Sequence, residues 1–250
     1  MYRMDRQLVR FYRTAENYLR YAPGHEGRTR ELSRFYQRYR RYFGRSVLDL
    51  ACGDGILGRV LERTRRTYVG VDANPDMLRE ARKSLSTRQS GQRFFKGDIS
   101  TVRIGGRFDT VTLLGNALGH LNVEEMDELL HHRRSNVHPG STFLLEYRDV
   151  VEMLWKRVWT PVYVQTHKRG KVISRTRFVD FSKGRIHIQA KPARGNWTVE
   201  YTQALWSPFI LDQVMKSGGW TAVSPSTNRV SSVGGADAFS RVGVYRYRGT

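Results

Sequence analysis

Along the chain, short apolar runs alternate with segments whose apolar residues recur every three or four positions. Short apolar runs predict buried strands at residues 47–50, 67–72, 94–99, 108–116 and 141–147. Apolar residues at three- and four-residue steps predict helices that start at residue 56 and cover residues 76–86, 123–134 and 209–216, and two last strands follow at residues 220–223 and 241–247. Alternating strands and helices of this length are typical of an α/β protein with a mostly parallel sheet.

Two segments depart from this alternation. The N-terminal part predicts amphipathic helices at residues 5–22 and 29–43, the second with an aromatic stripe opposite its arginines. This stripe could pack on the sheet edge or serve as a lid, and an Arg/Tyr helix could also lie on nucleic acid. Residues 163–206 alternate with period two and have glycines between the runs, which predicts an insertion of three to four antiparallel strands.

The most informative stretch for function is residues 47–58, where a strand runs into a glycine-rich turn and then a helix. Gly53 and Gly55 allow the backbone to take positive φ and to approach a ligand closely. Asp54 stands inside the turn and would repel a pyrophosphate. The turn therefore favours a cationic nucleoside without phosphates over a dinucleotide.

The turn and the strand ends that follow resemble motif I and the later motifs of class I S-adenosylmethionine (SAM)-dependent methyltransferases. Asp72 ends the second strand about 20 residues after the turn, where a carboxylate can accept both ribose hydroxyls, although it could instead cap the next helix. The resemblance implies SAM as cofactor, with S-adenosylhomocysteine as product. It implies a cofactor site formed by Asp49, Ala51, Cys52, Gly53, Gly55, Asp72, Ala73, Met77, Asp98, Ile99, Leu114, Gly115 and Asn116.

Residues 113–121 and 144–149 narrow the resemblance to the glycine and sarcosine N-methyltransferases. In that family the arginine at the position of Arg148 holds the substrate carboxylate, and bidentate pairing by a guanidinium suits a small planar anion. The resemblance also implies that Asn116 and His120 shape the loop at the methyl group and that Tyr201 closes the site. Glu146 and Asp149 depart from the family pattern, so a bulkier acceptor than glycine stays open.

The predicted fold is thus a Rossmann-like seven-stranded class I methyltransferase sheet with N-terminal helices and a small antiparallel β insertion. Residues 1–46 are expected to form a helical lid, residues 47–162 and 207–250 the SAM-binding core, and residues 163–206 an insertion that covers the acceptor site.

Composition limits the remaining choices. The single cysteine, Cys52, excludes an intrachain disulfide, and the histidine spacing fits no standard ligand set, so we expect no metal. Without an apolar run of about 18 residues or a signal-type N-terminus, we expect a cytoplasmic protein with no membrane span. The net charge of +20, with arginines scattered through nearly every segment, is either a compositional bias or a sign of nucleic-acid binding.

The predicted function is SAM-dependent N-methylation of a small amine or amino-acid-like substrate that bears a carboxylate. The alternatives are a tRNA or other RNA methyltransferase that uses the basic surface, and a methyltransferase acting on a protein or another metabolite. A small-molecule acceptor is the expected partner, and a homo-oligomer is left open.

Overall fold

The structure is a computed structural model, which describes residues 25–84, 92–156, 161–167, 170–194, 196, 198–224 and 240–249. The helix predicted over residues 5–22 lies outside the described residues.

The main sheet has seven strands in the order β10-β11-β5-β4-β1-β2-β3. Its strands are β1 (Ser46–Leu50), β2 (Thr67–Asp72), β3 (Gln92–Lys96), β4 (Thr110–Leu113), β5 (Thr142–Arg148), β10 (Trp220–Ser224) and β11 (Ser240–Tyr247). The pairs within β3-β2-β1-β4-β5 are all parallel, whereas β11 runs antiparallel to both β5 and β10. This arrangement confirms the predicted seven-stranded fold and its C-terminal hairpin.

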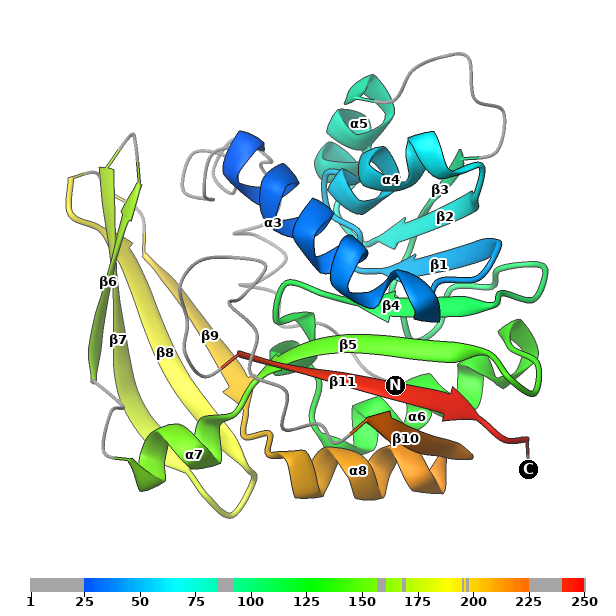
Figure 1. Cartoon of the computed structure of the whole chain (residues 1–250). Coiled ribbons are helices and arrows are strands. Elements are labelled where there is room, and N and C mark those ends of the chain that lie inside the picture. Colours follow the sequence, from blue (N-terminus) through cyan, green and yellow to red (C-terminus); the bar gives the residue numbers. More distant parts are fainter. Residues whose placement is uncertain are drawn as a thin grey trace.

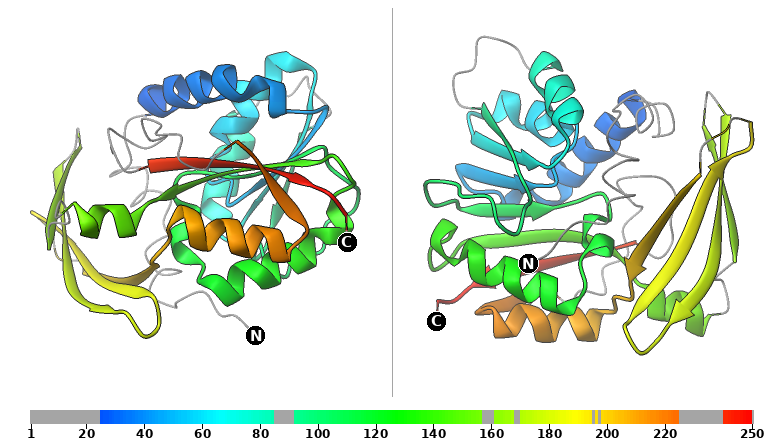
Figure 2. Two further views of the ribbon diagram at one scale, coloured as in Figure 1. Left: turned by 60° about the horizontal axis from the view of Figure 1, so that its bottom comes forward. Right: turned by 180° about the vertical axis from the view of Figure 1, so that it is seen from behind.

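Helices cover both faces of this sheet (Figures 1 and 2). The described helices are α3 (His25–Tyr39), α4 (Ile56–Leu61), α5 (Pro75–Ser84), α6 (Val123–Arg133), α7 (Val150–Trp155) and α8 (Pro208–Ser217), of which α7 packs on the small sheet instead. The short 3-10 turns are η1 (Arg40–Tyr42), η2 (Glu62–Thr64), η3 (Ala117–His120) and η4 (Arg134–Asn136). Residues of α3 and α4 share one buried cluster on one face, and residues of α6 and α8 share another on the opposite face.

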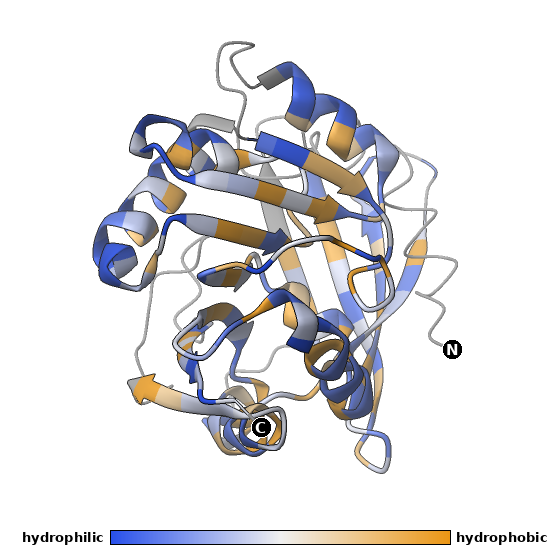
Figure 3. Cartoon of the chain, turned by 90° about the vertical axis from the view of Figure 1, so that its right-hand side faces the viewer, coloured by the Kyte–Doolittle hydropathy of each residue, from blue (hydrophilic) through white to orange (hydrophobic). Residues whose placement is uncertain are grey.

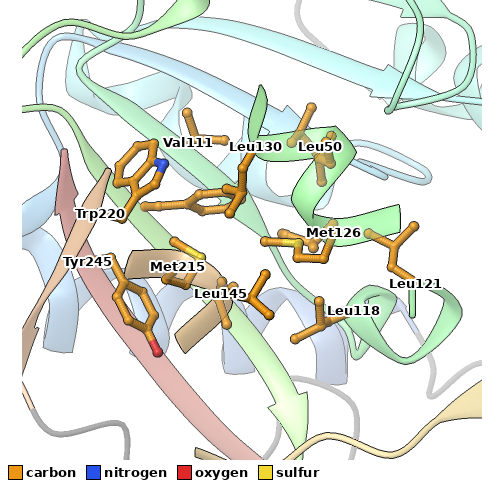
Figure 4. Packing of buried hydrophobic residues seen from close by; sticks show 14 of the residues in the cluster. Leu50, Val111, Leu118, Leu121, Met126, Leu130, Leu145, Met215, Trp220 and Tyr245 are labelled. Atoms are coloured by element: carbon orange, nitrogen blue, oxygen red, sulfur yellow. The ribbon is translucent and has the colours of Figure 1, made fainter. Parts of the chain in front are cut away.

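The larger cluster lies under α6 and α8 (Figure 4). Leu50, Val111 and Leu145 come from three adjacent strands and are fully buried. Trp220 of β10 adds an edge-to-face contact with Phe143 of β5, with ring centroids 5.4 Å apart. Burying one such aliphatic side chain stabilises the fold by roughly 1.5–3 kcal/mol, so this cluster holds the strand ends that carry the site.

Helix α3 packs its aromatic stripe against the opposite face of the sheet. Phe35, Tyr39 and Phe43 are at most 5% exposed, and the Phe35 and Tyr39 ring centroids lie 4.8 Å apart. The helix starts four residues earlier than predicted and ends at Tyr39, where η1 tightens the last turn before the extended Phe43. The stripe is therefore part of the core, and a lid role for this segment stays a prediction.

The insertion forms a separate four-stranded antiparallel sheet, as predicted. Its order is β6-β7-β8-β9, with β6 (Val162–His167), β7 (Gly170–Asp180), β8 (Arg185–Pro192) and β9 (Val199–Ala204). It stands beside the edge of the main sheet where the parallel strands end (Figure 1). Its inner residues Ile186 and Ile188 pack on Val150 of α7, a helix that the sequence pattern did not predict.

Two ionic contacts fix the insertion and α7 to the core. Arg185 of β8 lies 3.2 Å from Glu125, the residue that also completes the capping box of α6. Arg241 of β11, 4% exposed, pairs with Asp149 and Glu152 at the start of α7. Removal of one partner from such a buried group leaves an uncompensated charge, which destabilises a protein strongly.

Along the chain, hydrophobic residues gather in the strands and polar residues on the outer turns of the helices (Figure 3). Within the described part of the chain, no helix is both long and apolar enough to cross a membrane.

Candidate active site

The glycine-rich turn after β1 folds over the end of β2. Ala51, Gly53 and Gly55 have φ of 58°, 56° and 72°, so three residues in five are left-handed. The Cys52 N–H donates to the Val71 carbonyl at 2.9 Å. A Cβ on Gly53 would lie 3.3 Å from Cε of the buried Met77, so Met77 forms the floor below the turn.

Asp72 joins this turn to the start of α5. One carboxylate oxygen accepts the Gly53 N–H and the other accepts the Asn74 N–H, both at 2.8 Å. Burial raises the pKa of Asp72, and these two hydrogen bonds lower it. The helix cap is Asn74, whose Oδ1 accepts the Asp76 N–H, so the alternative role of Asp72 as the N-cap is wrong. Ala73 lies half-buried between the two.

Asp49 and Cys52 support the turn from below. Asp49 is 4% exposed and accepts hydrogen bonds from the Tyr68 hydroxyl at 2.6 Å and the Thr112 hydroxyl at 2.7 Å. Burial raises the pKa of Asp49 to about 6. Burial also raises the pKa of the Cys52 thiol well above its usual value, and its sulfur would be 2.8 Å from a Cβ on Gly70. The thiol thus stays protonated and fills space beside β2.

The end of β3 completes the predicted cofactor side. The Gly97 N–H donates to the Asp72 carbonyl at 3.1 Å, which brings the two strand ends together. Asp98 is half-buried and accepts the Ser100 N–H at 2.8 Å, while Ile99 packs against the core.

On the acceptor side, β5 holds the loop that follows β4. The Gly115 N–H donates to the Glu146 carboxylate at 2.9 Å, and the Arg148 N–H donates to Oδ1 of Asn116 at 3.1 Å. Asn116 has a left-handed φ of 59°, which asparagine tolerates better than most residues. Leu114 before them packs on the buried cluster under α3. Asn116 and Arg148 are therefore brought together, as the sequence implied.

The loop continues into η3, which contacts both β5 and β9. Trp206, 1% exposed, donates its indole N–H to the carbonyls of Leu118 and Leu121 at 3.1 and 2.9 Å, and so fixes the loop from behind. Burial lowers the pKa of His120 to about 4. His120 is accordingly neutral near pH 7, and its burial disfavours the protonated form.

Tyr201 of β9 faces the end of β5 from the small sheet. Burial raises its pKa, while a hydrogen bond with Ser174 and the positive charge of Arg148 lower it. Arg148 is half-buried at the end of β5. The structure thus places a guanidinium, a phenol and a neutral imidazole on the elements around one loop.

Three supporting residues were missed by the site prediction. Glu146 was noted only as a departure from a family pattern, yet it holds the Gly115 N–H. Trp206 anchors η3, and Tyr39 of α3 places a buried hydroxyl within electrostatic range of Glu146 with no hydrogen-bond partner among the described residues. Tyr39 lay in the aromatic stripe, but nothing in the sequence separated it from its core neighbours.

Comparison with known proteins identifies the core. Residues 47–140 match a family described as methyltransferase domain. The seven-stranded order with a C-terminal antiparallel hairpin is the class I methyltransferase fold. Residues 47–140 thus match a methyltransferase domain, and the fold is that of the class I SAM-dependent methyltransferases. The family match covers the turn, Asp72 and the loop after β4, which are the elements described above.

Proteins similar to this chain act on different amines. The chain is 33% identical over 121 residues to a dTDP-3-amino-3,6-dideoxy-alpha-D-glucopyranose N,N-dimethyltransferase of Streptomyces fradiae, covering 48% of this chain and 44% of that protein. It is 31% identical over 117 residues to glycine N-methyltransferase of Rattus norvegicus, covering 41% and 40%. The chain thus spans less than half the length of these relatives.

A solved amino pentose methyltransferase of Micromonospora echinaspora with SAM bound has the same fold. The TM-score is 0.61 at 20% sequence identity, covering 89% of this chain and 92% of that one.

Proposed function

We propose that this chain transfers a methyl group from SAM to the nitrogen of a small amine that carries a carboxylate. The observation that supports this most is the hydrogen bond from the Arg148 backbone N–H to Asn116, since it joins the loop at the end of β4 to the residue whose positive charge acts on Tyr201. The guanidinium of Arg148 can pair with a carboxylate through two parallel hydrogen bonds.

On the cofactor side, the turn and Asp72 fit a nucleoside. The two Asp72 oxygens each use one hydrogen bond within the protein and can accept further bonds from a ribose diol. Positive φ at Gly53 lets the backbone approach a ligand without a side chain in between. Asp54 is buried, which is compatible with a cationic ligand and unfavourable for a pyrophosphate.

Bound SAM supplies a methyl group activated by its positive sulfur, so that an amine lone pair displaces a neutral thioether in line. The protein therefore mainly has to align the amine and exclude water. In our proposal Arg148 orients the acceptor, Tyr201 covers it, and the loop of Asn116 sets its distance. The new ammonium loses its proton to water, because burial makes His120 too weak a base to take it, and His120 helps to shape the loop in its neutral form.

The test is methyl transfer from labelled SAM to separate small amines, with the product identified by mass spectrometry. Glycine, sarcosine and an amino sugar without a carboxylate are the informative acceptors, since the relatives act on glycine and on a sugar amine. Transfer to the carboxylate-bearing amines supports the proposal. Transfer to the sugar alone would overturn the role given to Arg148 and leave the cofactor side unaffected.

A further inference from the structure

The positive charge of the chain is concentrated in two segments. Residues 161–206 contain nine Lys and Arg against two acids, a net +7, and residues 1–46 contain twelve arginines against four acids, a net +8. The other 158 residues carry only +5 of the total +20. The excess charge outside residues 1–46 is therefore not spread over the chain, as expected above, but gathers in the insertion. A compositional bias alone would not leave the SAM-binding core nearly neutral.

Strand register shows which face of the small sheet carries this charge. The inner face holds Ile186, Ile188 and Tyr201, which share a buried cluster with Val150 of α7. Side chains on directly opposed residues lie on one face of an antiparallel sheet. The opposed pairs Arg175 with Gln189, and Ile173 with Lys191, therefore lie on the outer face.

This outer face combines exposed cations with a flat aromatic pair. Lys171, Arg175 and Lys191 are all exposed. Phe178, 55% exposed, stacks on His187 with ring centroids 3.9 Å apart and an angle of 18° between the planes. On the same face, Glu200 already accepts a hydrogen bond from Gln189 at 2.9 Å, so its charge is partly engaged.

We propose that the outer face of the β6–β9 sheet binds single-stranded RNA. Exposed cations pair with successive phosphates, and an aromatic ring on an open sheet offers a platform on which a base stacks regardless of its identity. A second copy of the chain fits less well, because two surfaces of the same charge repel each other. This surface lies on the opposite face of the sheet from Tyr201, so RNA binding is independent of the proposed amine methylation.

The experiment measures fluorescence anisotropy of a labelled oligouridylate of about 12 nucleotides on titration with the full chain. The affinity is measured between about 50 and about 200 mM salt. Phe178→Ala tests the stacking platform, and the pair Arg175→Gln with Lys191→Gln tests the phosphate contacts. The pair Arg103→Gln with Arg107→Gln is the matched control, since both arginines are exposed on the loop before β4 and the charge change is the same.

We expect Phe178→Ala to weaken binding by about 5-fold or more. The Arg175/Lys191 double variant should bind RNA at least about 10-fold more weakly, and the slope of log K against log salt concentration should become less steep by about 1.4. The control double variant should change the affinity by less than about 2-fold. Cofactor affinity and amine methylation, measured on each variant, should stay unchanged. Unchanged cofactor affinity shows that each variant is folded. If the wild type methylates none of the amines, the proposed function fails, but the RNA-binding result still stands.

Three results would overturn the proposal. The first is no RNA binding at low salt. The second is an equal loss in the control pair, which would mean that net charge alone attracts the RNA. The third is tighter binding to vesicles of phosphatidylcholine with phosphatidylserine than to RNA, lost in the same variants, which would assign the face to a membrane surface.

Discussion

The proposed cofactor side and the proposed acceptor side of this protein are built in different ways. On the cofactor side Asp72 makes contacts that are closer in sequence, because it receives N–H groups from residues 2 and 19 positions away. On the acceptor side, Gly115 bonds a residue 31 positions away, Asn116 one 32 away, and Trp206 one 88 away. The contacts of Asp72 join the turn after β1 to the end of the neighbouring strand β2. The acceptor site instead depends on how the two sheets pack together.

The largest effect should follow from breaking the cofactor side at Asp72. Asp72→Ala removes the acceptor of two backbone N–H groups and of the proposed ribose hydroxyls. Hydrogen bonds to a charged group are worth about 1.5–3 kcal/mol each, so the SAM Kd should rise about 100-fold or more. Isothermal titration calorimetry measures this, with Glu80→Ala on the following helix α5 as the control. A Kd within about 2-fold of the wild type would refute the assignment.

Breaking the acceptor side at Arg148 should leave the cofactor side intact. Arg148→Met keeps the length of the side chain and removes the guanidinium, so kcat/KM for a carboxylate-bearing amine should fall about 100-fold while the SAM Kd stays constant. Arg148→Lys should restore only part of the loss, because lysine lacks the planar fork. Steady-state kinetics measure kcat/KM for both variants and for Arg107→Met, an exposed arginine that serves as the control. An equal fall of kcat/KM in the control would mean that the net positive charge, and not a specific contact of Arg148, attracts the substrate.

The pH dependence of stability distinguishes the two sides, because His120 and Asp49 change the free energy of unfolding in opposite directions between pH 5 and pH 7. The pKa of His120, about 4, lies below its usual 6.5, so the unfolded chain binds the proton first and His120 adds about 2 kcal/mol of stability as pH rises from 5 to 7. The pKa of Asp49, about 6, lies above its usual 3.8, so Asp49 removes about 1 kcal/mol over the same range.

Relative to the wild type, His120→Gln should therefore lose stability, and Asp49→Asn should gain it, between pH 5 and pH 7. Urea unfolding at the two pH values measures the difference. Parallel curves for all three proteins would show that neither group has a shifted pKa.

The smallest effect concerns backbone strain in the turn. Ala51 has a left-handed φ, which costs an L-residue roughly 1–2 kcal/mol. Glycine removes this cost, but it also makes the unfolded chain more flexible, and this cancels part of the gain in stability. Ala51→Gly should thus stabilise the protein by about 0.5–1 kcal/mol, seen as a higher Tm. Ala73→Gly, where φ is not positive, should lower Tm instead, and a loss of Tm in both variants would contradict the strain at Ala51.

The same contrast explains what could be predicted from the sequence. The strands, the glycine turn and Asp72 were predictable because their pattern is set by periodicity and by steric limits on nearby residues. Helix α7 was missed because its six residues give no clear helical period, although a local cap marks its start, where the Asp149 side chain accepts the Glu152 N–H. The support that Trp206 gives to η3 was not predictable, since no local pattern reports a partner 88 residues away.

The central claim is that Arg148 orients the carboxylate of the acceptor, and one measurement tests it most directly. It compares kcat/KM for an amine bearing a carboxylate with that for the same amine as its amide, in the wild type and in Arg148→Met. The account predicts that the wild type prefers the carboxylate by about 10-fold or more and that the variant does not distinguish the two. The same preference in both proteins would contradict it.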